Sequence, residues 1–225
     1  MAKSYPKVKL LLDKNFDKKI FEIGGRAERG LRPEIRFLLK PEFADSRQKF
    51  LDAYVDSWQE RNKKDLALEI KRVQTEWSGL SKYFFAQVDK MFYGRPWPKG
   101  DYVGYGSMWF SFPRHIKDKK FAFPLFFNNK KRLASSVIAH EMLHFIQYDY
   151  LEKKHGLPPS DKTNSLFWQF TENLNVLIEN SQAWQPFMQG EISKPYEGNE
   201  ELYKKMKRIW DKNQDLDNLI NKILK

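Results

Sequence analysis

The hydrophobic residues near the start of the chain alternate with polar ones. In EIRFLLK (residues 34–40), Ile35 and Phe37 alternate with charged neighbours before two leucines, which predicts a β-strand. The preceding FDKKIFEIGGRAERG (residues 16–30) also has the pattern of an extended segment and ends in a glycine turn. We therefore expect strands in the N-terminal region.

The pattern changes to steps of three and four in residues 46–77, where aromatic and aliphatic side chains recur at helical spacing. This predicts one long amphipathic helix, or two helices with a break near Asn62. Gly79 is expected to end this element, and residues 81–92 form a further predicted helix. Residues 93–106 are rich in proline and glycine, which predicts a loop.

Two short hydrophobic runs follow this loop. SMWFSF (residues 107–112) and KFAFPLFF (residues 120–127) both have the composition of strands. Pro124 lies inside the second run and has no N–H to donate to a neighbouring strand. The second run is therefore predicted to lie at the edge of a sheet.

The second half of the chain is predicted to be helical. Residues 133–154 are apolar on almost every side, and the run ends in KKHG, a basic last turn followed by a glycine. A further helix is expected from a cap at Thr163 or Asn164 to about Asn180. A last helix is expected from about residue 200 to the end.

Three ionisable residues stand inside the most apolar of these helices. His140, Glu141 and His144 are surrounded by aliphatic residues, methionine and phenylalanine. Burial of such groups is costly unless a partner compensates them. The HExxH spacing places the two histidines one turn apart on the same helix face. Both imidazoles can there bind one Zn²⁺, at about 2.0–2.1 Å each.

Glu141 is rotated by about 100° from His140 around this helix. That offset keeps its carboxylate off the metal and next to the water that would attack a substrate. A carboxylate in this position can take a proton from the water, whose pKa the metal lowers. The motif therefore predicts metal-assisted hydrolysis with Glu141 as general base. A core histidine pair satisfied by hydrogen bonds, with Glu141 in an ion pair, is the alternative interpretation.

The composition of the chain limits which residue types can bind the metal and which partners its charge favours. The 225 residues include no cysteine, so disulfides and thiolate metal sites are excluded, and a metal must be bound by histidine and carboxylate. The net charge of +11 favours polyanionic or acidic partners, nucleic acid among them, although a lysine-rich solvated surface explains the same charge. No apolar run reaches the roughly 18 residues of a membrane span. The N-terminal apolar run is too short for a secretory signal, and we expect a cytoplasmic protein.

The segment VIAHEMLHF, which follows a long amphipathic helix and two predicted strands, resembles the active-site helix of zincin metallopeptidases. The resemblance covers about residues 34–180 and is specific only in the five-residue motif. It implies an α+β fold, mainly helical, with a small mixed sheet, a backing helix and the HExxH helix at the floor of the cleft. It also implies a zinc-dependent peptidase, with a peptide or protein substrate lying along residues 120–127 as an added strand.

A single domain over residues 1–225 is expected, because no segment has the composition of a flexible linker. Within the zincin resemblance, an upper lobe would comprise about residues 1–155 and a lower helical lobe about residues 156–225.

A catalytic zinc site usually has three protein ligands and one open position. The metzincin extension of the motif is absent, because Gln147 and Tyr150 stand where that subclass has glycine and histidine. The gluzincin subclass instead takes a glutamate from the next helix, and Glu172 follows His144 by 28 residues. The gluzincin resemblance thus implies Zn²⁺ bound by the motif histidines and Glu172.

Two other residues are candidates for the third ligand. Glu179 lies on about the same helix side as Glu172, either as a reserve ligand or as a carboxylate that holds a ligand histidine. His155, followed by glycine, is similar to the third histidine of SprT-like proteases, which act on DNA-associated proteins. An unbroken helix would place His155 about 16 Å along the axis from His144, too far to share a metal.

Three functions are consistent with these observations. The first is a gluzincin-type zinc metallopeptidase. The second is a SprT-like protease that acts on DNA-associated proteins, with His155 as a zinc ligand. The third is a non-catalytic basic module that binds nucleic acid or protein, in which HExxH belongs to a structural metal site. A closed shell of four protein ligands would indicate the third function.

Overall fold

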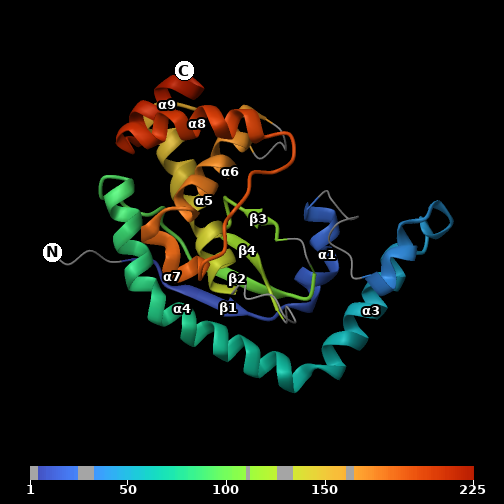
Figure 1. Ribbon diagram of the computed structural model, residues 1–225. Helices are drawn as coiled ribbons and strands as arrows, with labels where there is room; N and C mark the ends of the chain where they lie inside the picture. The colour runs from blue at the N-terminus through green and yellow to red at the C-terminus, as the bar shows by residue number, and fades with distance from the viewer. Residues whose placement is uncertain (1–4, 25–32, 110–111, 126–133, 161–164) are drawn as a thin grey trace. The chain divides into compact units, whose positions relative to one another are not determined.

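A computed structural model of the protein describes residues 5–24, 33–109, 112–125, 134–160 and 165–225 (Figure 1). The fold is α+β and mainly helical, with one small mixed sheet, as the sequence predicts. The chain forms two compact units, one of residues 1–79 and 99–138 and the other of residues 80–98 and 139–225. None of the helices in the described ranges combines the length and apolar character that a bilayer span requires. The single domain expected from the sequence stays a prediction.

The first unit contains a four-stranded sheet in the order β1-β2-β4-β3. Three strands run parallel, and the short β3 is antiparallel to β4. The bounds of these strands are β1 Val8–Leu11, β2 Tyr102–Ser107, β3 Arg114–His115 and β4 Lys120–Pro124. Of the strands expected from the sequence, only the one at residues 120–127 is confirmed, over its first five residues.

Glycines explain why β2 is missed by sequence reasoning. A Cβ atom at Gly104 would lie 2.8 Å from the side chains of both Leu10 and Phe121. At Gly106 it would lie 2.9 Å from Ile70 of helix α4 (Lys63–Met91). These glycines therefore let the neighbouring strands and α4 pack closely on β2, whereas in the sequence they predict a loop.

Two predicted extended segments are helical, and both predictions were wrong. Residues 34–39 lie in the 3₁₀ helix η1 (Pro33–Leu39), where Ile35 and Leu38 are buried at a spacing of three residues. That spacing matches the three residues per turn of a 3₁₀ helix, so the alternation of Ile35 and Phe37 was misleading. The segment from residue 16 forms most of helix α1 (Lys14–Gly24), and residues 25–30 lie outside the described residues.

The prediction of a strand at residues 107–112 is also wrong for residues 108–109, which the structure describes. Ser107 ends β2, and a bend follows at these two residues. Pro124 does not mark an edge strand, since β4 lies between β2 and β3. β3 pairs only with Lys120 and Phe121, so its ladder requires no N–H from Pro124. At Lys120 and Phe121 the strand is therefore paired on both sides and offers no free edge to a peptide.

The two-helix interpretation of residues 46–77 is confirmed, with α3 (Arg47–Arg61) and α4 separated at Asn62 (Figure 1). The Asn62 side chain donates to the carbonyl oxygen of Trp58 at 2.7 Å and caps α3. Gly79 does not end α4, which continues to Met91 and so includes almost all of the helix predicted at residues 81–92. Glycine in an exposed helix costs about 1 kcal/mol, which a helix of this length tolerates.

A buried carboxyl group holds α1 to the rest of the first unit. Asp17 is 1% exposed and accepts hydrogen bonds from Ser107 Oγ at 2.8 Å and Gln59 Nε2 at 2.9 Å. Its backbone carbonyl accepts from Trp109 Nε1 at 2.9 Å. Burial raises the pKa of Asp17 to about 7, although the hydrogen bonds oppose this rise.

This pKa predicts how stability depends on pH. Because the folded-state pKa of Asp17 exceeds its unfolded value, its contribution is complete below about pH 4 and is lost as pH rises through about 7. We expect Asp17→Asn to reduce the fall in unfolding free energy between pH 5 and pH 8 by about 2–4 kcal/mol. Urea titrations at both pH values measure this fall. The exposed Asp118→Asn is the control, and an unchanged pH slope in Asp17→Asn would contradict the prediction.

The second unit is helical in its described part. It includes the C-terminal parts of α4 and of α5 (Ala134–His155), followed by α6 (Leu166–Glu179) and α7 (Gln185–Met188). The predicted motif helix and the helix ending near Asn180 are confirmed. Thr163 and Asn164 lie outside the described residues, and Ser165 caps α6 by accepting the Trp168 N–H.

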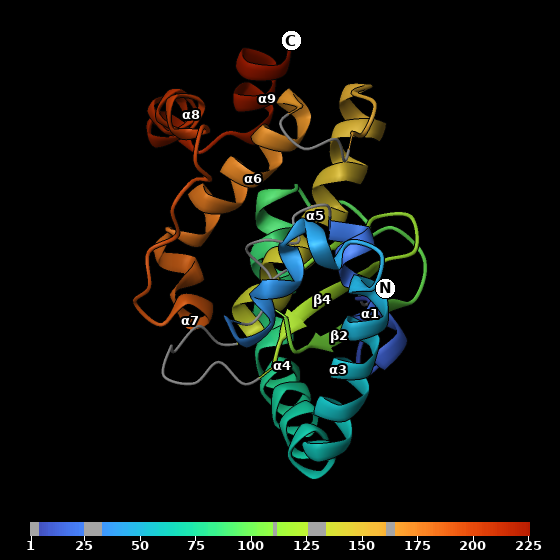
Figure 2. The same ribbon diagram turned by 90° about the vertical axis from the view of Figure 1, so that its right-hand side faces the viewer.

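The predicted last helix is two helices, α8 (Glu200–Asn213) and α9 (Leu216–Leu224). Gln214 between them adopts a left-handed conformation with φ of 51°, and Asp215 caps α9. Figure 2 shows both helices at the C-terminal end of the chain, with α8 packed beside α6.

Candidate metal centre

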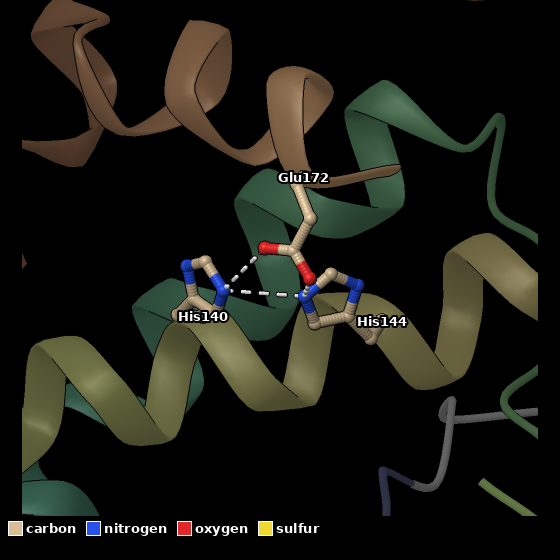
Figure 3. Close-up of side chains that lie close together, drawn as sticks. All are labelled: His140, His144 and Glu172. Carbon is tan, nitrogen blue, oxygen red and sulfur yellow. Dashed lines mark hydrogen bonds and ion pairs between the residues drawn. The ribbon is translucent and has the colours of Figure 1, made fainter. Parts of the chain in front are cut away.

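The two motif histidines lie on one face of α5, as their spacing predicts. Figure 3 shows both imidazole rings projecting from α5 towards Glu172 of α6. The His144 side chain is fully buried and the His140 side chain is 13% exposed. Their neighbours Met142, Leu143 and Ile146 are buried in the core, so apolar packing explains why this helix is hydrophobic on almost every side.

Glu172 is brought to the histidines by the packing of α6. Its side chain is 2% exposed, and its two oxygens lie 3.4 Å from His140 Nε2 and 3.6 Å from His144 Nε2. The apolar residues Phe170 and Leu174 of α6 are buried as well. The helix is therefore covered on both sides, and Glu172 is not a solvated residue opposite an apolar face.

The spacing of the three donor groups fits a metal ion. The Nε2 atoms of His140 and His144 are 3.2 Å apart, and each faces a different oxygen of Glu172, Oε2 at 3.4 Å from His140 and Oε1 at 3.6 Å from His144. Ligand atoms at 2.0–2.1 Å from a tetrahedral ion are separated by about 3.3–3.4 Å. Within the described ranges, this is the one group of three such side chains whose donor atoms could hold a metal.

The electrostatics of the group favour a positive charge. Burial lowers the pKa of His140, but the carboxylates of Glu179, Glu172 and Glu141 together outweigh it and raise this pKa to about 10. Without a metal, the raised pKa favours the imidazolium form of His140, whose Nδ1 donates to Glu179 Oε1 at 2.7 Å. A divalent ion would compensate the same buried carboxylates.

Glu179 contacts the first histidine on the nitrogen that does not face Glu172. This position matches the second of its two predicted roles, a carboxylate that orients a ligand histidine, and not that of a reserve ligand. Ser193 Oγ donates to the other oxygen of Glu179. Sequence reasoning identified Glu179 from its helical spacing but gave no sign of Ser193.

Asn175 is a further residue of the site that sequence reasoning did not select. Its Nδ2 donates to His144 Nε2 at 3.0 Å and to the His140 carbonyl oxygen at 3.2 Å. Its Oδ1 accepts from Gln147 Nε2 at 2.6 Å. Because an amide nitrogen only donates, His144 Nε2 is an acceptor here, with its proton on Nδ1. This is the tautomer whose Nε2 lone pair can bind a metal.

His155 lies outside this group. Helix α5 continues unbroken to His155, whose Nε2 is 2.9 Å from Asp217 Oδ1. Lys154 and Tyr150 contact the same carboxylate at 2.6 and 2.7 Å. His155 therefore helps to hold α9 against α5 in this structure.

Glu141 is buried at the position that follows His140, where its charge contributes to the raised pKa of that histidine. It is thus close to the candidate metal centre, and its role as general base stays a prediction.

Comparison with known proteins gives no relative from which a function could be transferred. No family model matches the chain, and neither the curated proteins nor the solved structures include a match. The functional assignment depends on the chemistry of the site itself.

Proposed function

We propose that the protein is a zinc-dependent hydrolase of peptide bonds, in which His140, His144 and Glu172 hold the ion and Glu141 is the general base. One observation carries the proposal. Two imidazole nitrogens and a carboxylate, on two different helices, lie 3.2–3.6 Å apart. These are the ligand types and separations of a catalytic zinc site with three protein ligands, and the HExxH glutamate adjoins them.

Each residue has a defined task in this proposal. When bound, zinc would polarise the scissile carbonyl group and lower the pKa of water in the site. Glu141 takes a proton from the attacking water and returns it to the amine that leaves, so its carboxylate is regenerated. Glu179 keeps the His140 ring oriented through Nδ1. The low exposure of Glu141, Glu172 and His144 keeps bulk solvent from weakening these interactions.

Metal removal tests the proposal in the unaltered protein. We expect about one zinc per chain by elemental analysis, and cleavage of a mixed peptide library detected by mass spectrometry. Cleavage should stop after dialysis against a zinc chelator and return on addition of Zn²⁺. Stoichiometric zinc without cleavage of any peptide would contradict hydrolysis, and absence of zinc binding would contradict the metal centre.

A non-catalytic metal site is the second candidate, and the position of Asn175 favours it. Its amide already contacts His144 Nε2 at 3.0 Å, so rotation of that amide would present Oδ1 as a fourth ligand. X-ray absorption spectra of the zinc-loaded protein would then be altered by Asn175→Ala. Spectra that do not change would support an open position. The SprT-like alternative stays untested, and the pairing of His155 with Asp217 does not support ligation by His155.

A further inference from the structure

The segment of residues 190–199, between α7 and α8, is held against the end of α6. Asn180 is the C-cap of α6, and its side chain makes two hydrogen bonds with the backbone of Ser193. The Ser193 N–H donates to Asn180 Oδ1 at 2.9 Å, and Asn180 Nδ2 donates to the Ser193 carbonyl at 2.9 Å. These two hydrogen bonds fix the backbone of Ser193, although the side chain of the preceding residue, Ile192, is 77% exposed to solvent.

The clamp by Asn180 brings the Ser193 hydroxyl to the buried carboxylate of Glu179. Ser193 Oγ donates to Glu179 Oε2, and His140 Nδ1 donates to Glu179 Oε1 at 2.7 Å. Each oxygen of this carboxylate therefore has its own donor. A carboxylate held at both oxygens cannot rotate freely, so the direction of its bond to the His140 ring is fixed.

A second contact places the same segment along the metal-binding part of α6. The ring of Tyr196 packs on Trp168 with their centroids 5.4 Å apart. Trp168 precedes Glu172 by one helical turn, whereas Glu179 follows it by two turns. The segment thus contacts α6 on both sides of the proposed zinc ligand.

We propose that Ser193 is a positioning residue for the metal centre, acting through Glu179 on the orientation of His140. The proposal rests on the metal site described above, but not on peptide hydrolysis. Groups that orient a ligand histidine typically change metal affinity by about 10–100-fold. Because Ser193 acts one hydrogen bond further from the metal, we expect the lower end of this range.

The test compares Zn²⁺ affinity in three variants by competition with a chelating dye. Ser193→Ala should weaken binding by about tenfold. Ser193→Thr keeps the hydroxyl and should restore the affinity. Ser181→Ala is the matched control, because the Ser181 hydroxyl donates to the Ile178 carbonyl at the same end of α6 and not to Glu179. It should bind Zn²⁺ as the unaltered protein does.

Two further measurements separate positioning from a general loss of structure. Nitrogen NMR shifts of the His140 ring should change in Ser193→Ala and stay unchanged in Ser181→Ala. Urea unfolding in the presence of chelator should show similar stability for both variants. Equal Zn²⁺ affinity of Ser193→Ala and the unaltered protein overturns the positioning role alone. If the unaltered protein binds no Zn²⁺, the metal site and this role are both wrong, and if it binds Zn²⁺ but cleaves no peptide, only the hydrolase proposal is wrong.

Discussion

Replacement of Glu141 by glutamine is expected to lower kcat/KM for peptide hydrolysis by about 10²–10⁴-fold without loss of zinc, because a positioned general base contributes that factor. Glutamine has nearly the same shape as glutamate and can occupy the same buried position in α5. Its neutral amide cannot take a proton from water at neutral pH. The zinc-loaded variant should therefore bind substrate but cleave it very slowly.

The control for this substitution lies on the same helix. Glu152 is exposed on α5, and Glu152→Gln makes the same chemical change away from the candidate centre. It should retain both zinc and activity. Peptide cleavage is followed by mass spectrometry and zinc by elemental analysis on the same samples. A zinc-loaded Glu141→Gln variant as active as the unaltered protein would rule out Glu141 as the base.

The helix that contains the HExxH motif could be predicted because the evidence for it lies in neighbouring residues of the sequence. The spacing of His140 and His144 fixes their common face in any α-helix, and the apolar neighbours indicate burial. Glu172 was predicted in a different way, from the gluzincin resemblance, because on a helical wheel it lies opposite the apolar residues Phe170 and Leu174. Its burial depends on α5 and the rest of the unit covering α6, which no local pattern encodes.

The residues that sequence reasoning did not select at the site act through tertiary contacts. Asn175 reaches His144 only because α5 and α6 pack together, and Ser193 reaches Glu179 only because Asn180 clamps a segment without regular structure. Asparagine and serine are also common in loops and caps, so their presence in the sequence carries little information. The same limit applies to β2, whose glycines serve close packing in the folded protein.

The buried charges of the centre explain why a metal ion is the favoured interpretation over a satisfied core histidine pair. Glu141, Glu172 and Glu179 are each at most 4% exposed, and they come from two helices that pack together. The raised pKa of His140 shows that these carboxylates favour a positive charge between them. One imidazolium compensates only part of three carboxylates, whereas a divalent ion bound to neutral histidines would bring two positive charges in place of that one.

Removal of the second histidine has the largest expected effect on the metal. We expect His144→Ala to weaken Zn²⁺ binding by more than about 100-fold, because loss of a direct ligand exceeds the 10–100-fold effect of residues that only orient ligands. The variant should also lose all measurable peptide cleavage. Zinc at 100 times its Kd stabilises a protein by about 2.7 kcal/mol, and this ligand-dependent increase in stability should disappear.

The matched control for this variant is His155→Ala, which removes an imidazole from the same helix. His155 pairs with Asp217, so its loss should lower stability slightly and leave zinc affinity unchanged. Circular dichroism in chelator establishes that both variants are folded, since His144→Ala also leaves a cavity and removes the acceptor for Asn175. If His155→Ala loses zinc as His144→Ala does, His155 is a third ligand beside the motif histidines, and the SprT-like interpretation replaces the one proposed here.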